Sequence, residues 1–588
     1  MAKVLWVLLF WIAFLLPVHL FPFQDLPNDL AAMLLACSLF AFVMVTGSRS
    51  AFRVPVIFFL LLAVLFSVVL SAFFVGEFIF TDYTYAIFIV CGLLLTVSVA
   101  NLKVTSDELI ESLALSLVVV AAFTAIYGLL RYYGVLNLYF PWMTAESARL
   151  LGPLNQANLT SLVLAFGIAA SCYLVRVKRM GLPLAMTISM GLAVAGSLTG
   201  SRALVGFVFM VLLIPVFKGI ISDLGIKVMP KTLLETSKSS LAVVFAVLMV
   251  IFLYPMANKP VLTLLVEEGV LERVSNESVA DRFGLTDSYR EEEWRKLYVY
   301  NDLVENTLTG VGPGRYAKYS IDADAVIGTP QRSGTLWIHS HNLFINALVE
   351  LGYIGFLTVL AIIGYLVFLF IRVPSDPKHY FIFTLLGMLF LNNMVEFSFW
   401  MFGFFALGVS LVALCDRHVE VKTSSQGVVV LVGVLVLATS IGSFLYVGKD
   451  AWASIYGFHK SQLTEEERYR FLDAKKNRFI GGDAFKAQII REKVSLFGVK
   501  AQMQELEGYL VWRPEMAFMM RYSVLQSVVG PQDKACEIVK KTVRLYPKSV
   551  ERLVDELAEA KDLGATYNID FIHRCIADGM MYWVERGN

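Results

Sequence analysis

The feature that most restricts how this chain folds is a series of long apolar runs within roughly the first 450 positions. Several runs reach about 18 residues or more, long enough for a helix to cross a hydrocarbon core of about 30 Å. Only 16% of the residues are charged, whereas soluble domains carry about 25%. The sequence therefore predicts an all-α polytopic membrane protein.

About thirteen transmembrane helices are expected. The first stretch, MAKVLWVLLFWIAFLLPVHLF, has no small-residue cleavage site, so we expect a retained span rather than a removed signal peptide. The spans are predicted at residues 3–21, 27–45, 55–75, 83–100, 109–130, 157–175, 182–199, 203–218, 239–256, 342–371, 380–397, 400–415 and 427–447.

The basic residues of the short connections predict the direction of these spans. Connections after even-numbered spans carry lysines and arginines, from Arg49 and Arg53 to Arg417 and Lys422. The short loops FPFQDLPND, VGEFIFTDY and NNMVEF, after odd-numbered spans, carry none. The positive-inside rule then places the N-terminus in the cytoplasm. Residues 1–447 become a transmembrane domain with one large outer loop at 257–341, and residues 448–588 an outer soluble domain.

The outer domain is expected to be helical. KACEIVKKTVRLYPKSVERLVDELAEAKDLG has helical apolar spacing with a YPKS break between two helices. Cys536 and Cys575 are the only cysteine pair on the outer side, so we expect a disulfide there; two buried free thiols are the alternative. The formal net charge of +1 favours neither a nucleic-acid partner nor a strongly acidic one.

Polar clusters gather on the predicted outer side, under a topology derived without them. Because polar groups at membrane depth are costly, this coincidence predicts a functional site. The clusters are Gln156 and Asn158 in GPLNQANLTS, Arg202 in SLTGSRALVGF, Arg290 in SYREEEWRKLY ahead of the turn GVGPGRY, and His339, His341 and Asn342 in IHSHN.

Each cluster also has a purely structural interpretation. Gln156 and Asn158 could cap a helix, and Arg202 could reach the membrane interface. Arg290 stands among other charges, where a solvated helical face is the default. GVGPGRY lacks the lysine and hydroxyl of a P-loop. The two histidines could cap span ten; no metal is expected, because no third His, Cys or carboxylate stands at ligand spacing nearby.

Span ten carries a polar stripe of its own. Asn342, Asn346 and Glu350 follow at i, i+4 and i+8 and so share one helical face. Such a stripe should face the bundle interior or a wet cavity rather than lipid. Hydrogen bonding between helices explains it equally well.

The inventory of two arginines, histidines and amides suits one kind of chemistry. It does not match a glycosidase, which needs two facing carboxylates. It suits displacement of a leaving group that is already a good anion, such as a diphosphate. Arginine can hold phosphate oxygens bidentately, and a histidine can accept the proton of an attacking hydroxyl.

These motifs together resemble a known superfamily. Arg202 in TGSR, Arg290 before a tryptophan and GVGPGRY, and HSHN followed by ELGYIGF resemble the bacterial O-antigen ligase, O-antigen polymerase and O-oligosaccharyltransferase superfamily over about residues 150–415. GPLNQANL and the long outer domain are similar to PglL-type protein O-oligosaccharyltransferases. NNMVEFSFW resembles that branch's E-Y-P-L segment, but Phe397 and Ser398 replace its tyrosine and proline.

The resemblance implies a glycosyltransferase of C-type architecture in the bacterial inner membrane, with its site and C-terminal domain in the periplasm. It would move a glycan from undecaprenyl diphosphate to Ser or Thr of an exported protein such as a pilin, with inversion and without metal or cofactor. His341, Arg202 and Arg290 are the implied catalytic residues. The implied substrate-binding residues are Gln156, Asn158, His339, Asn342, Arg315 and Glu396.

Other functions fit the same residues. An O-antigen ligase would use lipid A–core as the acceptor, and a polymerase would extend the glycan on its own carrier. A transporter for lipid-linked sugars is a further alternative, although no internal repeat or paired discontinuous helices are evident. The outer domain favours a protein acceptor, since it offers a place for one to dock.

Overall fold

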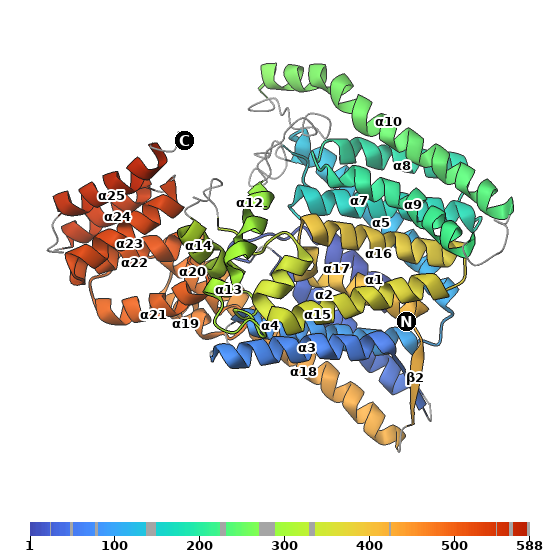
Figure 1. The fold of residues 1–588 in the computed structure, drawn as a ribbon, viewed down its shortest axis with the longest axis horizontal. Helices are drawn as coiled ribbons and strands as arrows, with labels where there is room; N and C mark the ends of the chain where they lie inside the picture. Colours follow the sequence, from blue (N-terminus) through green and yellow to red (C-terminus); the bar gives the residue numbers. More distant parts are fainter. Residues whose placement is uncertain are drawn as a thin grey trace.

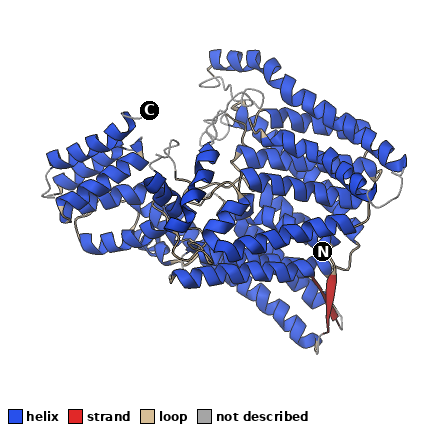
Figure 2. Cartoon of the chain, in the orientation of Figure 1, coloured by secondary structure: helices blue, strands red, loops and turns tan. Residues whose placement is uncertain are grey.

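The computed structural model describes residues 1–23, 25–47, 51–76, 80–136, 149–223, 231–269, 289–327, 336–422, 425–547, 550–563 and 569–584. Helices dominate these residues (Figures 1 and 2), which confirms a largely helical fold. Thirteen of them overlap the predicted spans: α1 (Ala2–Leu15), α2 (Leu26–Thr46), α3 (Val56–Val75), α4 (Phe80–Ala100), α5 (Ser106–Tyr132), α7 (Ala157–Arg176), α8 (Leu182–Ser197), α9 (Ala203–Asp223), α10 (Lys231–Glu267), α15 (Leu343–Arg372), α16 (Pro377–Val395), α17 (Phe402–Cys415) and α18 (Gln426–His459).

Nine helices within the described residues are long and apolar enough to cross a membrane, so the chain is a multi-pass membrane protein. They are α2, α3, α4, α5, α7, α9, α10, α15 and α18. The other four, α1, α8, α16 and α17, fall short in length or in apolarity. The total of thirteen spans therefore stays a prediction.

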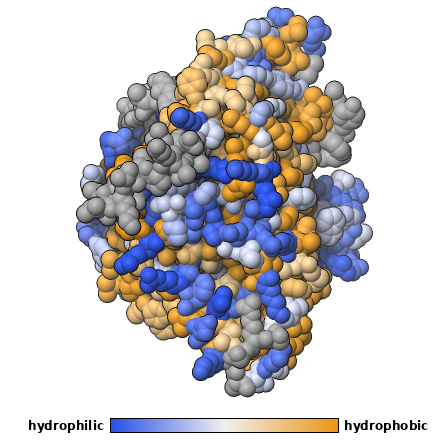
Figure 3. Space-filling view, turned by 90° about the vertical axis from the view of Figure 1, so that its right-hand side faces the viewer, coloured by the Kyte–Doolittle hydropathy of each residue, from blue (hydrophilic) through white to orange (hydrophobic). Residues whose placement is uncertain are grey.

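Connections that were predicted to share a side do lie at one end of the bundle. Ion pairs join three of them: Lys3 with Glu108 at 2.9 Å, Arg179 with Glu111 at 3.0 Å, and Lys378 with Asp107 at 2.7 Å. Figure 3 faces this end, where hydrophilic side chains at the centre are flanked by apolar ones. The alternation of span directions thus agrees with the arrangement of the helices.

A short antiparallel sheet at the same end was not predicted. Strand β1 (Ala51–Pro55) pairs with β2 (His418–Lys422), with Ala51 opposite Lys422. The two strands come from connections after α2 and after α17, which lie far apart in sequence. A two-residue-period pattern of only five residues is too short to be recognised beside long apolar runs.

Helix α7 lies at the centre of the transmembrane bundle and is buried along almost its whole length. Its hydroxyl groups bond within the helix: Thr160 donates to the Gln156 carbonyl and Ser171 to the Gly167 carbonyl. No hydrophobic force drives helices together inside lipid, so close packing and satisfied polar groups must hold such a helix in place. The first turn of α7 is thereby fixed, and this turn carries Asn158.

Four short helical segments cover the opposite end of the bundle: α12 (Tyr289–Arg295), η1 (Lys296–Val299), α13 (Tyr300–Leu303) and α14 (Tyr316–Ile327). Lys296 is buried and donates to Glu293 at 2.5 Å, Ser320 at 2.7 Å and Asp324 at 2.9 Å. The default of a solvated face holds for one side of SYREEEWRKLY, where Glu291 and Arg295 are exposed, and Lys296 belongs to a buried side that was not predicted. The network anchors α12 to α14 because an unpaired buried charge would cost several kcal/mol, roughly 3–5.

The C-terminal residues form a helical group with its own apolar core, to the left in Figure 1. Helix α18 runs without a break past the predicted boundary at residue 447 and ends at His459. After it come α19 (Glu465–Asp473), η3 (Ala474–Lys476), α20 (Gly481–Arg491), α21 (Val499–Trp512), α22 (Met516–Val529), α23 (Gln532–Leu545), α24 (Val550–Asp562) and α25 (Ile569–Val584); a last short helix, η2 (Ser398–Trp400), lies between α16 and α17.

A disulfide joins α23 to α25. Cys536 and Cys575 are bonded, with their Cα atoms 5.3 Å apart, which confirms the predicted pairing. The sequence separation of 39 residues closes a long loop in the unfolded chain. Closure of such a loop removes conformational freedom from the unfolded state and so stabilises the folded domain.

Replacing Cys536 and Cys575 together with serine is expected to lower the unfolding free energy of the C-terminal domain by about 2–5 kcal/mol. Thermal unfolding of the full chain in detergent, with and without a reducing agent, measures the effect. Reductant should shift wild type toward the double variant and leave the double variant unchanged. A wild-type protein that keeps its transition after confirmed alkylation of both thiols would contradict the prediction.

Candidate active site

The two histidines lie in an extended segment that leads into α15. Its backbone is held at Ser340, whose carbonyl accepts a bond from Nε1 of Trp294 at 3.1 Å. His341 has a positive φ of 53°, which is uncommon for a residue other than glycine and costs of order 1–3 kcal/mol. Asn342 then caps α15, because its Oδ1 accepts from the backbone N–H groups of Phe344 and Ile345.

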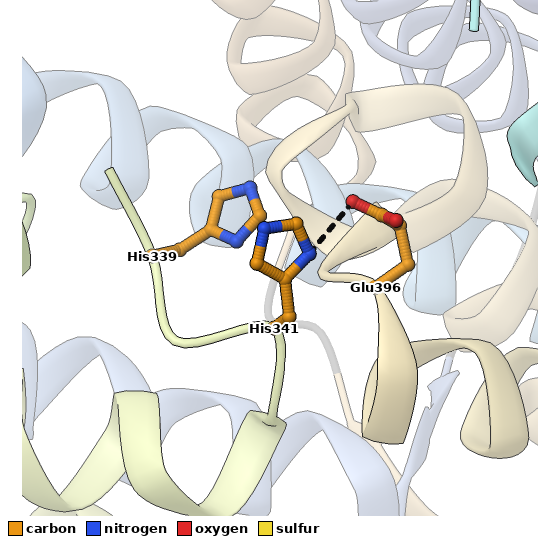
Figure 4. Close-up of side chains that lie close together, drawn as sticks. All are labelled: His339, His341 and Glu396. Carbon is orange, nitrogen blue, oxygen red and sulfur yellow. Dashed lines mark ion pairs between the residues drawn. The ribbon is translucent and has the colours of Figure 1, made fainter. Parts of the chain in front are cut away.

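Glu396 approaches these histidines from another segment. Helix α16 ends at Val395, and Glu396 follows it in extended conformation. One carboxylate oxygen, Oε1, lies 2.9 Å from Nδ1 of His341, an ion-pair distance, although the approach misses the angle of a hydrogen bond. Figure 4 shows the His341 ring and the carboxylate facing each other. Since Nδ1 faces Glu396, Nε2 is the ring nitrogen left for a substrate.

The other carboxylate oxygen has two further donors. Nδ2 of Asn158 donates to Oε2 of Glu396 at 2.6 Å, and a guanidinium nitrogen of Arg290 lies 3.4 Å from it. Burial by itself raises the pKa of a carboxyl group. Here His341, His339 and Arg290 outweigh burial and lower the pKa of Glu396 to about 2. The carboxylate is therefore ionised at neutral pH although its side chain is buried.

His339 differs from His341 in its surroundings. Burial, and then the neighbouring His341, lower the pKa of His339 to about 3, so its imidazole is neutral. Its ring centroid lies 4.3 Å from that of His341 and 5.8 Å from that of Phe397. Nδ1 of His339 is buried and has no hydrogen-bond partner among the described residues. Such an atom is suited to a ligand that supplies the missing partner.

A second buried polar atom lies near Asn158. Gln156 stands at the N-cap position of α7 but makes no capping bond through its side chain. Its Oε1 is buried and lacks a hydrogen-bond partner within the part of the chain that the structure describes. Helix capping therefore does not explain Gln156. Arg202 lies two residues after the turn at 198–200, where Gly200 has a positive φ of 60°.

Arg315 lies apart from this cluster. It is buried, with a guanidinium nitrogen 3.6 Å from Asp82 of α4. Together with Glu507 and Trp512 of the C-terminal group it lines a separate cavity. The implied substrate-binding role of Arg315 therefore stays a prediction, and the cavity that it lines is not the one beside Phe397.

GVGPGRY forms a turn, as its sequence indicated, and the structure shows that this turn packs against α15. Gly310 and Gly352 lie against each other: a Cβ on Gly310 would come within 2.6 Å of the Gly352 nitrogen. Gly352 has φ 65° and ψ −164°, which breaks the regular course of α15. Glu350 accepts a bond from the backbone of Tyr316 at 3.3 Å, and Asn346 one from Ser340 at 3.3 Å. The polar stripe of span ten therefore holds loops in place.

An apolar cavity of about 240 Å³ opens within the bundle beside the cluster. Helices α3, α4, α15, α16 and α17 form its walls. Phe397, whose ring approaches His339, and Asn346 belong to the lining. Phe397 therefore borders both the apolar cavity and the ring of His339.

The expectation that no third metal ligand stands nearby is wrong. Ligand atoms of His339, His341 and Glu396 lie within 4.8 Å of one another. Sequence spacing missed the group because Glu396 belongs to another loop. Two imidazoles and one carboxylate match the donor types that zinc uses. The field opposes a cation, however, since Arg290 lies 3.4 Å from Glu396, and a bound metal would have to compete with it.

Of the nine predicted residues, five make one cluster: Asn158, Arg290, His339, His341 and Glu396. Sequence reasoning missed Arg149, which bonds to Asn158, and Trp294, which fixes Ser340. A lone arginine three residues before GPLNQANL was the available signal for Arg149. No protein-family model matches the chain, and no curated protein sequence is significantly similar to it.

Replacing Gly352 with alanine is expected to destabilise the protein and disturb the histidine segment. The backbone at Gly352 is open only to glycine, so strain of about 1–3 kcal/mol is expected. A Cβ would also lie 2.4 Å from the Leu308 carbonyl. Thermal unfolding in detergent measures the loss. Gly364→Ala, on the same helix with open space around its Cβ, is the control. Equal midpoints for the two variants would contradict the prediction.

Proposed function

We propose that this chain is a protein O-oligosaccharyltransferase of the bacterial inner membrane. It transfers a glycan en bloc from undecaprenyl diphosphate to a Ser or Thr hydroxyl of an exported protein such as a pilin, with inversion at the anomeric carbon. The supporting observation is the His341–Glu396 pair, which stands beside Arg290 and next to Phe397, a residue that lines an apolar cavity.

The proposed orientation follows from the two ends of the bundle. The end with the ion pairs of Lys3, Arg179 and Lys378 carries the basic connections and is assigned to the cytoplasm. The His341 cluster belongs to loops at the opposite end, which is assigned to the periplasm. A glycan donor carried on a membrane lipid would meet secreted proteins on that side.

The proposed reaction is a single displacement. The acceptor hydroxyl oxygen attacks the anomeric carbon, a new C–O bond forms, and the bond from that carbon to the lipid diphosphate breaks. Nε2 of His341 takes the hydroxyl proton, and the lipid diphosphate leaves with the electron pair. Glu396 stabilises the imidazolium because its ionised carboxylate lies 2.9 Å from Nδ1.

The arginines would act on the leaving group. A diphosphate gains negative charge as its bond to the sugar breaks, and a guanidinium fork can bind two of its oxygens. Arg290 is already placed by the buried Lys296 network and by Glu396, so it needs little reorganisation. Gln156 and His339 each offer a buried polar atom for hydroxyl groups of the glycan.

The apolar cavity suits the isoprenoid chain of the donor. Its walls are almost entirely apolar and come from helices of the transmembrane bundle. A lipid tail in this cavity would place its diphosphate near Phe397 and His339. The family's tyrosine is absent at position 397, so its hydroxyl plays no part in this protein.

The C-terminal group supports a protein acceptor. Leu336, three residues before His339, packs in one apolar cluster with Met519 and Tyr546 of that group. An acceptor bound there would approach the histidine segment directly. A ligase or polymerase would use the same donor chemistry, so the acceptor distinguishes these functions.

The proposed role of His341 as the general base can be tested by substitution. Wild-type protein, a lipid-diphosphate glycan and a pilin-like acceptor should yield glycosylated protein in the presence of chelator, whereas His341→Ala should lose at least about 100-fold in rate, the usual effect of removing a general base. A parallel reaction contains lipid A–core. Product on lipid A–core alone would indicate a ligase, and loss of wild-type activity with chelator would indicate that the three ligands hold a required metal.

The proposed contact of Arg290 with the diphosphate can also be tested by substitution. Arg290→Lys should lower transfer by about 10- to 100-fold, since a lysine ammonium cannot reproduce a bidentate contact with the diphosphate. Arg295→Lys, on the same helix, replaces an exposed arginine paired with Glu291 and is the matched control. Full transfer by Arg290→Lys would exclude the proposed diphosphate contact.

A further inference from the structure

Arg149 contacts Asn158, which in turn contacts Glu396. Its NH2 donates to Oδ1 of Asn158 at 3.0 Å, and its Nε donates to the carbonyl of Thr199 at 2.6 Å. The next backbone N–H, of Leu150, donates to the Leu198 carbonyl at 2.8 Å. One side chain thus connects the first turn of α7 with the turn that leads to Arg202.

The two bonds of Asn158 define the orientation of its amide. A guanidinium group can only donate, so its partner on Asn158 must be the amide oxygen, and only the amide nitrogen is left to donate to Glu396. The amide oxygen must therefore face Arg149, and the amide nitrogen must face Glu396, as the distances of 3.0 Å and 2.6 Å indicate. A flipped amide would set its NH2 against the guanidinium and its oxygen against the carboxylate. Arg149 consequently favours the amide orientation in which Asn158 donates a hydrogen bond to Glu396.

We propose that Arg149 is a positioning residue for the transfer reaction. It holds Asn158 in the orientation that fixes Glu396, and thereby the His341 ring, and it anchors the turn before Arg202. This inference rests on the proposed function for its kinetic consequence. Arg149 itself contacts protein groups at both of these positions and acts on the reacting atoms only through them.

Lysine cannot substitute for this geometry. The bonds to Thr199 and Asn158 leave Arg149 from two different nitrogens of one planar group. A single ammonium nitrogen on a flexible stem cannot reach both acceptors with the same directions. Arg149→Lys keeps the positive charge, but it is not expected to retain wild-type activity.

The kinetic test uses Arg149→Gln, Arg149→Lys, Asn158→Leu and the double variant Arg149→Gln with Asn158→Leu. Both Arg149 variants should lower kcat by about 10- to 100-fold, as losses of orienting partners do, with little change in the KM for donor. The double variant should lose clearly less than the product of the two single losses, because both changes remove the same bond between Arg149 and Asn158. Arg179→Gln, an exposed arginine at the opposite end of the bundle, is the control.

Three kinetic results would overturn the inference. They are full activity in Arg149→Gln, multiplied losses in the double variant, and a raised donor KM with unchanged kcat. The last result would make Arg149 a direct donor contact.

A second readout does not require transfer activity. Modification of His341 by diethyl pyrocarbonate, followed by peptide mass spectrometry, reports how firmly the ring is held against Glu396. The rate of His341 modification should rise a few-fold over wild type, and to the same extent, in Arg149→Gln, Asn158→Leu and the double variant. The rate in Arg179→Gln should match that of wild type. This pattern in a wild-type protein that transfers nothing would reject the proposed function and retain the positioning role. A wild-type rate in Arg149→Gln would reject the positioning role.

Discussion

The site depends on one buried carboxylate that stays ionised. Removing a charge of this size from water costs several kcal/mol unless nearby groups compensate for it. Glu396 is compensated by an imidazole, an amide and a guanidinium that come from three different segments. The need to satisfy a single carboxylate therefore brings together the start of α7, helix α12 and the segment before α15.

These three segments lie in a loop or near a helix end, so each needs support of its own. Non-helical backbone at membrane depth is tolerated only where protein buries it or a polar cavity receives it. The histidine segment is held by Trp294 from one side and by the apolar cluster around Leu336 from the other. Helix α12 rests on buried Lys296, and the kink at Gly352 lets the 308–310 turn pack closely on α15. Contacts outside the cluster therefore hold the segments that carry its side chains in place.

The sequence predicted what depends on local pattern and missed what depends on long-range contact. Apolar runs located the thirteen described helices that overlap the predicted spans, and the charges of connections such as those around Lys103 and Lys378 predicted which of them share an end. Five of the nine candidate residues lie in one cluster. They could be picked out from the sequence because polar groups next to apolar spans are costly and therefore often functional. The burial of Lys296, the β1–β2 pairing and the contact of His341 with Glu396 were not predictable from spacing. Arg315, which looked equally promising, is instead paired with Asp82.

In the proposed reaction, the pairing of His341 with Glu396 would also resolve a conflict between the two tasks of the site, which are to accept a proton and to bind a diphosphate. Guanidinium groups suited to a diphosphate create a positive field, and such a field opposes a second positive charge on a nearby imidazole. A carboxylate at 2.9 Å offsets that field at the one ring where a proton must arrive. Because Asn158 and Arg290 hold its other oxygen, Glu396 cannot turn toward the leaving group and repel it. In that reaction a histidine base and Arg290 can act side by side only when the carboxylate is immobilised, and we propose that Asn158, held by Arg149, meets this constraint.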